Sequence, residues 1–410
     1  MAGNASKRVL AGLLVQFGSF VVILGIPDGL LGVLWPSMRR GLHLPLADLG
    51  ELVLAGTVLY FAGGLVGDTV RRVLGFHNTL FWATVAGLAS LAGWAAAPAW
   101  WAVIVSFSIL GLVKGTLDAV LNAEAAIEGG VRRLGLLHAS WAIGGTLGPI
   151  IVAVLVTTGH WRIAVAVVAV AAGFLVPLAA VRPARAAGPA APQTAAASPA
   201  ASTAATTATP PRRHTRHEWV GMGATTLAFF AYTAAEAGPI SWGTTYLLSD
   251  RRLGTAGAAL AMALFWAALT LGRLALAVPN PFRPARVLEV SCWLFVLGMA
   301  LFWVLPGRYG VVGLPVAGLG SATIFPLYVA LTPDRLGEAV TGRAVGLSIA
   351  GAAVGGPVAV ACFGLLASHN GISVLAPCLF GAAVLMYLTH RLLALVVRRL
   401  PPVSPEVARP

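Results

Sequence analysis

Charged side chains are scarce in this sequence, and acidic ones are the scarcest. Only 10% of the 410 residues are Asp, Glu, Lys or Arg, and 14 residues are acidic. Soluble domains carry roughly 25% charged residues, so this chain has too few charges to cover a water-facing surface. Hydrophobic residues make up 58% of the chain, and its mean hydropathy is +0.86. These values exclude an ordinary soluble protein and predict an integral membrane protein.

Motifs of nucleic-acid-binding and enzymatic proteins are also missing. The net charge of +13 comes from scattered basic pairs without an aromatic-rich reading motif, which excludes nucleic acid as a partner. The three cysteines lie in apolar stretches without metal-ligand spacing, so we expect no disulfide framework, no metal and no cofactor. HExxH, GxSxG and Walker-type GxxxxGKS/T sequences are absent. The sequence therefore predicts neither a standard hydrolase nor an ATP-driven pump, and we expect no enzyme activity.

Long apolar runs fill most of the chain instead. A helix needs about 20 apolar residues to cross a bilayer. Lys7-Arg8 leads directly into the first run, which we expect to be retained as a helix. The sequence predicts an all-α, polytopic membrane protein with twelve transmembrane helices, near residues 9–34, 49–67, 77–97, 101–125, 136–158, 162–181, 219–247, 256–277, 286–305, 310–331, 343–367 and 371–396.

A stretch rich in Ala, Pro, Ser and Thr, residues 182–217, divides these spans into two groups of six. Its composition cannot bury a core, so we expect a flexible linker. The predicted organisation is a six-helix bundle at 1–181, the linker, a second six-helix bundle at 218–397 and a tail at 398–410.

Arginine and lysine are distributed unevenly between the two sides of the predicted spans. With the N-terminus inside, the cytoplasmic segments hold eighteen of them and the opposite side holds six. Because positive residues favour the cytoplasmic side, we expect both termini and the linker to be cytoplasmic, in a multi-pass protein of the cytoplasmic membrane.

The two groups of spans also repeat one another. Asp28 in "IPDGLLGVLWP" corresponds to Glu236 in "AAEAGPISWG", 208 positions later, and Pro149 corresponds to Pro357 at the same offset. "GD" at 67–68 and "GR" at 272–273 differ by 205 positions. These offsets indicate a duplicated six-helix unit, with chance matching in an Ala- and Gly-rich chain as the alternative.

The 6+6 layout, the central linker and the basic turn after the second span resemble the major facilitator superfamily over residues 8–397. The resemblance implies two bundles around a central cavity that opens alternately to each side of the membrane.

The stretch "GLVGDTVRRVLG", residues 64–75, is similar to the superfamily's signature loop between spans 2 and 3. Gly64 and Asp68 keep its spacing and Arg72 fits a basic position, whereas Thr69 and Arg71 depart from it. A carboxylate here can meet the positive end of a neighbouring helix. The resemblance implies that Asp68, Arg71 and Arg72 close a cytoplasmic gate; a basic turn that only sets topology is the alternative.

Glycine-proline elements occur in spans 5 and 11. Gly144, Gly148 and Pro149 lie in "GGTLGP", and Gly356 and Pro357 lie in "AVGGP". Small residues four apart let helices approach closely, and a proline adds a kink. We expect hinge or packing sites at these five residues.

A narrow polar stripe runs along span 4. Lys114, Asp118 and Asn122 fall on one face of a helix, whereas Glu124 points elsewhere. Placing a charge at the bilayer centre costs roughly 2.5–3.5 kcal/mol on insertion scales, so the stripe should face protein or water. The i,i+4 spacing predicts that Lys114 pairs with Asp118, and a static ion pair is the alternative to a functional one.

The sequence "LDAVLN" in span 4 resembles the fucose-permease-like branch of the superfamily. In that branch a carboxylate, with an asparagine four residues on, lies among sugar-binding and proton-coupling groups; Asp118 and Asn122 match this spacing. If Lys114 keeps Asp118 charged, then Asp28 and Glu236 become the better proton carriers. Their depth from the span starts places both in the outer half of the membrane, where contact with outer-rim arginines is the alternative.

Further candidates lie on spans 5, 7, 8 and 9. His138 is expected to face Glu124 and to relay protons or to satisfy a helix end. Arg273 and Glu289 are expected as gate partners or a packing pair. Four aromatic rings could stack on a solute: those of Trp141, Trp266, Trp242 and Tyr246. Packing at the membrane interface or in the protein core is the alternative for each.

The sequence thus predicts a secondary active transporter that moves a small organic solute, a sugar or polyol, by alternating access and proton coupling. The same fold would also serve a proton-driven exporter of drugs or secondary metabolites. A different class is a non-transporting membrane sensor or scaffold. We expect a monomer whose partners are the solute, protons and the lipid bilayer.

Overall fold

The computed structural model describes residues 2–156, 160–181, 215–276, 278 and 282–400. Within these ranges every regular element is a helix. The elements are α1 (Ala2–Ser19), the π-helical turn η1 (Phe20–Gly25), α2 (Ile26–Leu42), α3 (Asp48–Leu74), α4 (Phe76–Ala96), α5 (Trp100–Leu155), α6 (Trp161–Ala179), α7 (Arg216–Ser249), α8 (Thr255–Leu276), α9 (Pro284–Val304), the 3-10 turn η3 (Gly307–Val312), α10 (Gly313–Ser321), α11 (Ile324–Ala330), α12 (Thr332–Leu336), α13 (Glu338–Asn370), the 3-10 turn η4 (Ile372–Val374) and α14 (Leu375–Arg399). Most of the predicted linker, residues 182–214, and of the tail, residues 401–410, lies outside the described residues.

Eleven helical stretches of the described chain are long and apolar enough to cross a membrane, and each coincides with a predicted span. The remaining predicted span, 219–247, corresponds to α7, a 34-residue helix that packs against α13 and α14. Thr, Tyr, Glu and Ser residues along α7 lower its hydropathy, and many of its residues are buried. Helices suit this setting because lipid offers no hydrogen bonds to a backbone, so each span must satisfy its own.

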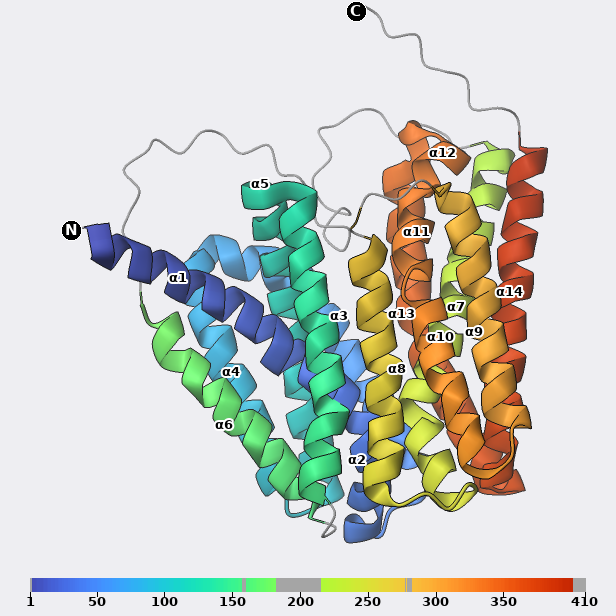
Figure 1. Ribbon diagram of the computed structural model, residues 1–410. Coiled ribbons are helices and arrows are strands. Elements are labelled where there is room, and N and C mark those ends of the chain that lie inside the picture. The colour runs from blue at the N-terminus through green and yellow to red at the C-terminus, as the bar shows by residue number, and fades with distance from the viewer. Residues whose placement is uncertain (1, 157–159, 182–214, 277, 279–281, 401–410) are drawn as a thin grey trace, which may run out of the picture.

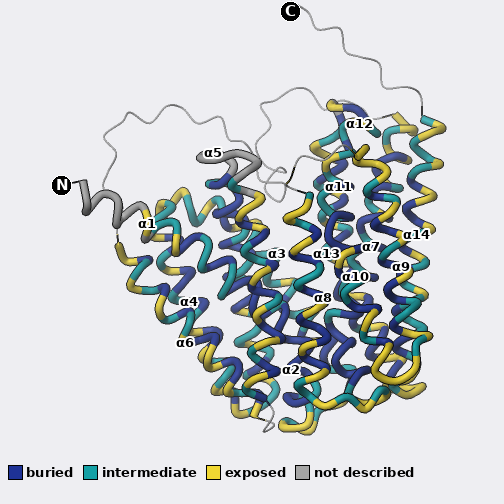
Figure 2. Tube along the Cα trace, viewed as in Figure 1, coloured by how far each residue is buried: buried dark blue, intermediate teal, exposed yellow. Residues whose placement is uncertain are grey.

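The helices form two halves that lie side by side (Figure 1). The N-terminal half comprises α1–α6, blue to green, and the C-terminal half comprises α7–α14, yellow-green to red. Across the interface α5 packs against α8, α3 against α13 and α2 against α7. Buried residues gather inside the halves and between them, whereas the outer faces carry exposed Leu, Val and Phe side chains (Figure 2). An apolar outer face is what a lipid environment requires.

Element α5 contains two of the predicted spans. Its apolar stretches Trp100–Ala125 and Gly135–Leu155 run in opposite directions and meet at the upper side of the molecule (Figure 1). The prediction of separate spans at 101–125 and 136–158 is therefore confirmed. We refer to them as the first and second arms of α5.

Two helices extend beyond their predicted ends. Helix α2 continues to Leu42 rather than ending near residue 34, and α3 continues to Leu74 rather than residue 67. The expected signature loop at 64–75 is therefore mostly helix, and Gly75, with φ of 79°, separates α3 from α4. Both extensions end with arginine pairs in their last turn, where positive charge opposes the negative end of the helix dipole.

Candidate functional site

A cavity of about 280 Å³ lies between the two halves. Six helices line it, three from each half: α2, α3, α5, α7, α8 and α13. Its charged lining residues are Asp28, Lys114 and Glu236, and its aromatic ones are Tyr60, Phe107, Trp141 and Trp266. A larger hollow of about 750 Å³ between α4 and α6 has an Ala-, Leu-, Val- and Phe-rich wall with one arginine, so it offers few polar partners. The cavity between the halves is the candidate site.

Asp28 accepts two hydrogen bonds from α5. It lies in the first turn of α2, directly after the π-helical turn η1, near the middle of the span Gly12–Leu42. Lys114 on the first arm donates to Oδ1 in an ion pair, and Trp141 Nε1 on the second arm donates to Oδ2 over 2.9 Å. The predicted Lys114–Asp118 pair is therefore wrong, whereas the predicted outer-half position of Asp28 stays a prediction. Helical spacing shows only partners on the same helix, whereas packing of α5 on α2 supplies a nearer carboxylate.

Asp118 has neutral partners instead. The Tyr60 hydroxyl of α3 donates to Oδ2 over 2.7 Å, and Asn122 Nδ2 donates to Oδ1 over 2.8 Å. The predicted proximity of Asp118 and Asn122 is confirmed, and Asn122 is buried. Of the polar stripe, Lys114 lines the cavity, while Asp118 and Asn122 lie behind Tyr60.

Glu236 lines the cavity from α7, between the middle of that helix and its Ser249 end, and its predicted outer-half position stays a prediction. The Tyr232 hydroxyl lies 2.7 Å from Glu236 Oε1 and 3.1 Å from the carbonyl of Ser321. Arg273 on α8 is the cation whose charge acts on Glu236. In the described part of the chain, no basic group reaches Glu236 within ion-pair distance.

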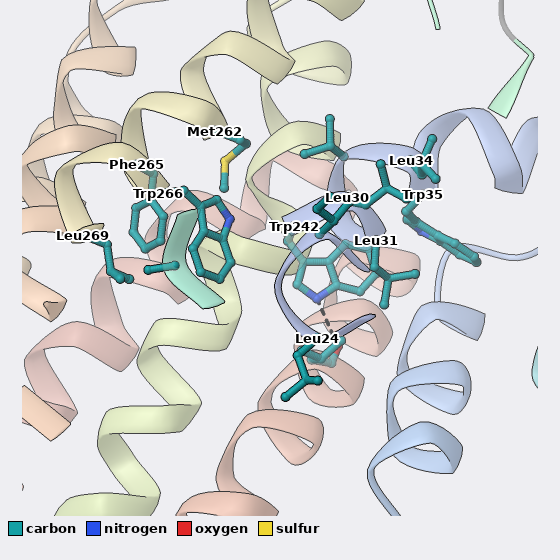
Figure 3. Close-up of a cluster of buried hydrophobic side chains, with 14 of the residues drawn as sticks. Leu24, Leu30, Leu31, Leu34, Trp35, Trp242, Met262, Phe265, Trp266 and Leu269 are labelled. Atoms are coloured by element: carbon teal, nitrogen blue, oxygen red, sulfur yellow. Dashed lines mark hydrogen bonds between the residues drawn. The ribbon is translucent and has the colours of Figure 1, made fainter. Parts of the chain in front are cut away.

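Trp141 and Trp266 line the cavity together. Their ring centroids are 5.3 Å apart at 74°, an edge-to-face contact, and the Arg273 guanidinium lies 4.8 Å from the Trp141 centroid. Trp242, Trp266, Leu30 and Leu31 belong to one buried cluster contributed by α2, α7 and α8 (Figure 3). Trp242 donates to the carbonyl of Val360 over 3.1 Å, and Tyr246 is buried too, so both pack inside the protein rather than at a membrane interface.

The family model of the Major Facilitator Superfamily matches residues 10–360. This chain belongs to that superfamily. The fold is that of twelve transmembrane helices in two halves, and the chain is a multi-pass secondary transporter of small organic solutes, not an enzyme.

Solved structures of superfamily members share this fold. The crystal structure of nucleoside transporter NupG matches with a TM-score of 0.71 and 16% identity, covering 94% of this chain and 98% of that chain. A mutant of the same transporter matches with a TM-score of 0.68 and 16% identity, covering 93% and 99%. No curated protein matches the chain.

The superfamily's signature segment, residues 64–75, forms ion pairs at the end of α3. Asp68 pairs with Arg72 one turn later on the same helix. Arg71 reaches Glu124 on the first arm of α5 with 3.6 Å between Nη2 and Oε2. Both arginines therefore have acidic partners. Whether the pairs act as a gate stays a prediction.

His138 and Glu289 have partners other than those predicted. The His138 ring is exposed and lies edge-on to Phe20, with centroids 6.3 Å apart, while Glu124 pairs with Arg71. The expected Arg273–Glu289 pair is wrong, because the two residues lie in different clusters. Glu289 accepts from Tyr387 over 2.9 Å and Arg391 over 3.1 Å, and its Oε2 is 3.0 Å from His390 Nε2.

The glycines of the first glycine-proline element lie where two helices approach closely. A Cβ on Gly144 would lie 2.8 Å from Gly25 Cα, and one on Gly148 would lie 2.7 Å from the Leu30 nitrogen. Both glycines therefore allow the second arm of α5 to contact η1 and α2, which confirms their packing role. Pro149 and Pro357 lie within continuous helices. In α13 the tightest approach is at Gly355, whose Cβ would overlap the Phe230 carbonyl, rather than at the predicted Gly356.

Tyr60, Phe107 and Thr233 are among the lining residues that sequence reasoning missed. Tyr60 and Thr57 lie three residues apart on α3 and both line the cavity. Polar groups on one face of an otherwise apolar span mark interior-facing positions, so this spacing was the available signal. Phe107 lies in an apolar run and gave none.

Proposed function

We propose that this transporter carries a small, neutral, polyhydroxylated ring compound, a sugar, polyol or nucleoside, in symport with protons. The cavity between the halves carries this proposal, because it combines an ion pair and a carboxylate with aromatic walls. Aromatic faces bind the apolar face of a ring, and a few polar groups set orientation and specificity. Lys114 and Asp28 offer the donor and acceptor that hydroxyl groups need.

Glu236 is the carboxylate best suited to carry the proton. It lines the cavity from the C-terminal half and accepts from a tyrosine rather than from a cation. Asp28 is held by Lys114, so solute hydroxyls that compete for Lys114 would change its environment. Carboxylates inside membrane spans mark proton and substrate pathways.

The likeness to NupG supports a nucleoside or its sugar moiety as the solute class. The span 4 motif with Asp118 and Asn122 supports the fucose-permease-like branch, for which a sugar is the corresponding solute. Both point to hydroxyl-bearing rings.

We also propose how the chain is oriented in the membrane and which parts of it move. Both termini and residues 182–217 face the cytoplasm, following the distribution of arginines. The segments 1–181 and 218–397 move as two bodies about the cavity, as in alternating access.

The test is a solute panel with the purified full chain in proteoliposomes under an imposed pH gradient. The panel contains fucose, glucose, xylitol, uridine and adenosine, with the cationic dye ethidium for the export alternative. We expect accumulation of at least one hydroxylated solute above equilibrium, lost when a protonophore is added. Glu236→Gln and Asp28→Asn should reduce this accumulation at least tenfold, with exposed Trp82→Phe as the matched control. Proton-driven movement of ethidium alone, or no flux of any solute, would contradict the proposal.

A further inference from the structure

Trp141 contacts charged residues of both halves at once. Its ring nitrogen donates to Asp28 Oδ2 within the N-terminal half over 2.9 Å. Its ring face lies under the Arg273 guanidinium of the C-terminal half, 4.8 Å from the centroid. Trp266, two turns before Arg273 on α8, contacts the same ring. The indole is therefore a physical link between the Asp28–Lys114 ion pair and the opposite half.

Arg273 depends on this ring for electrostatic compensation. Among the described residues no carboxylate lies within 4.0 Å of its guanidinium, and its Nε is buried without a hydrogen-bond partner. A cation over an indole face is attracted by the ring, most strongly where water is excluded. Thr146 and Thr270, with hydroxyls 3.4 Å apart, lie on the same α5–α8 contact. Loss of the stacking would weaken the contact between the halves.

We infer that Trp141 is a positioning residue that transmits the state of the Asp28–Lys114 pair to Arg273 and so to the contact between the halves, an inference that rests on the proposed function. While Asp28 is charged and paired, Oδ2 holds the indole N–H and fixes the ring plane under Arg273. When a proton binds Asp28 at Oδ2, or a solute hydroxyl takes the place of the indole at Oδ2, the N–H loses its charged acceptor and the ring turns. Arg273 then loses its π face, and α5 separates from α8.

Other charged and titratable groups surround this link and act on the same step. The charge of Asp28 interacts electrostatically with the hydroxyl of Tyr60, a residue of α3. The same hydroxyl donates a hydrogen bond to Asp118 on α5. The charge of Arg273, on α8, interacts electrostatically with Glu236 on α7 and with His138 on the second arm of α5. The groups that face the link are thus Lys114, Tyr60, Asp118, His138 and Glu236.

The experiment separates the two functions of the indole. Trp141→Phe keeps a π face for Arg273 but removes the donor to Asp28, and Arg273→Met removes the cation. The measured quantity is the ratio of proton-driven uptake to solute counterflow in proteoliposomes, with the panel solute that the parent chain accumulates most. Each variant is expected to lower this ratio about tenfold. The control, Trp82→Phe on the outer face of α4, should keep the parental ratio.

The double variant decides whether the two contacts form one chain. Because both act in series, Trp141→Phe with Arg273→Met should lower the ratio no further than either single change. The inference would be overturned, while the proposed function stands, by a double variant whose loss equals the product of the two single losses. A parental ratio in Trp141→Phe would overturn it as well. If Trp141→Phe does not fold, as judged by size-exclusion chromatography, a parental ratio in Arg273→Met would overturn it equally. A parent chain that accumulates no panel solute overturns both proposals.

Discussion

Asp28, Asp118 and Glu236 are carboxylates set into membrane-spanning helices, and they differ in what compensates each charge. Asp28 has the Lys114 ammonium, Asp118 has the hydroxyl of Tyr60 and the amide of Asn122, and Glu236 has the hydroxyl of Tyr232. Charged side chains at such depth are costly unless they are paired or hydrated. Of these three carboxylates only Asp28 is in an ion pair, so only there does removal of the carboxylate leave a cation without its partner.

The Asp28–Lys114 pair gives a prediction about stability. Asp28→Asn and Lys114→Gln should each destabilise the protein by about 2–3 kcal/mol. This is below the roughly 3–5 kcal/mol of a fully buried pair, because the Asp28 side chain stays 33% exposed. The double variant Asp28→Asn with Lys114→Gln removes both charges and should lie within about 1 kcal/mol of the parent. Thermal unfolding of the purified chain in detergent measures this; a double variant as unstable as the sum of the singles would argue against a mutual pair.

Which residues carry charge inside the membrane could be read from the sequence, but their partners could not. The stripe of Lys114, Asp118 and Asn122 follows from helical periodicity alone. The partner of Lys114 depends on how closely α5 approaches α2, which small residues such as Gly25 and Gly144 determine. Such a contact between distant segments leaves no local spacing signal.

At the scale of elements, hydropathy located the spans well and their ends poorly. Helices α2 and α3 run past their predicted ends because their last turns contain arginine pairs, which lower hydropathy without interrupting the helix. The turn between α3 and α4 narrows to Gly75, with φ of 79° and ψ of 155°, a conformation that glycine alone adopts readily. Polar helix ends and loops are alike in composition, so only the backbone distinguishes them.

Contact between α2 and α7 gives a prediction at this scale. A Cβ on Gly32 would overlap the Ile240 carbonyl, so Gly32→Ala should force the two helices apart on the side where residues 43–47 lie. The cavity residue Ser241, changed to cysteine, should then react at least fivefold faster with an impermeant maleimide added from that side. Gly223→Ala, on the same helix as Ser241, has no atom within 4 Å of the added Cβ and is the matched control. Equal rates in both variants would mean that α2 and α7 do not seal the cavity there.

At the scale of the whole molecule, the repeat seen in the sequence corresponds to equivalent positions in the two halves. Asp28 on α2 and Glu236 on α7 both line the cavity from their own half. Pro149 and Pro357 both lie in interface helices, α5 and α13. These equivalent positions are what the predicted duplication requires.

Orientation in the membrane is a prediction for the whole chain. A green fluorescent protein fused after Arg399 should fluoresce, because the C-terminus is expected in the cytoplasm. Alkaline phosphatase inserted after His43 should be active, because α2 ends at the lower side of the molecule whereas α14 ends at the upper side (Figure 1). Phosphatase activity from a fusion after Arg399 would reverse the assigned orientation.

The central claim is that two halves rock about one site, and inter-half distances test it most directly. In a background without the three native cysteines that retains flux, spin labels near the starts of α4 and α13, at Asn78 and Glu338, report one side. Labels near the end of α2 and in η4, at Arg40 and Ser373, report the other. Pulsed electron resonance is recorded at pH 8 and at pH 5.5 with the most strongly accumulated panel solute. We predict that the two distances change in opposite directions; two distances that stay fixed, or that change together, would contradict the account.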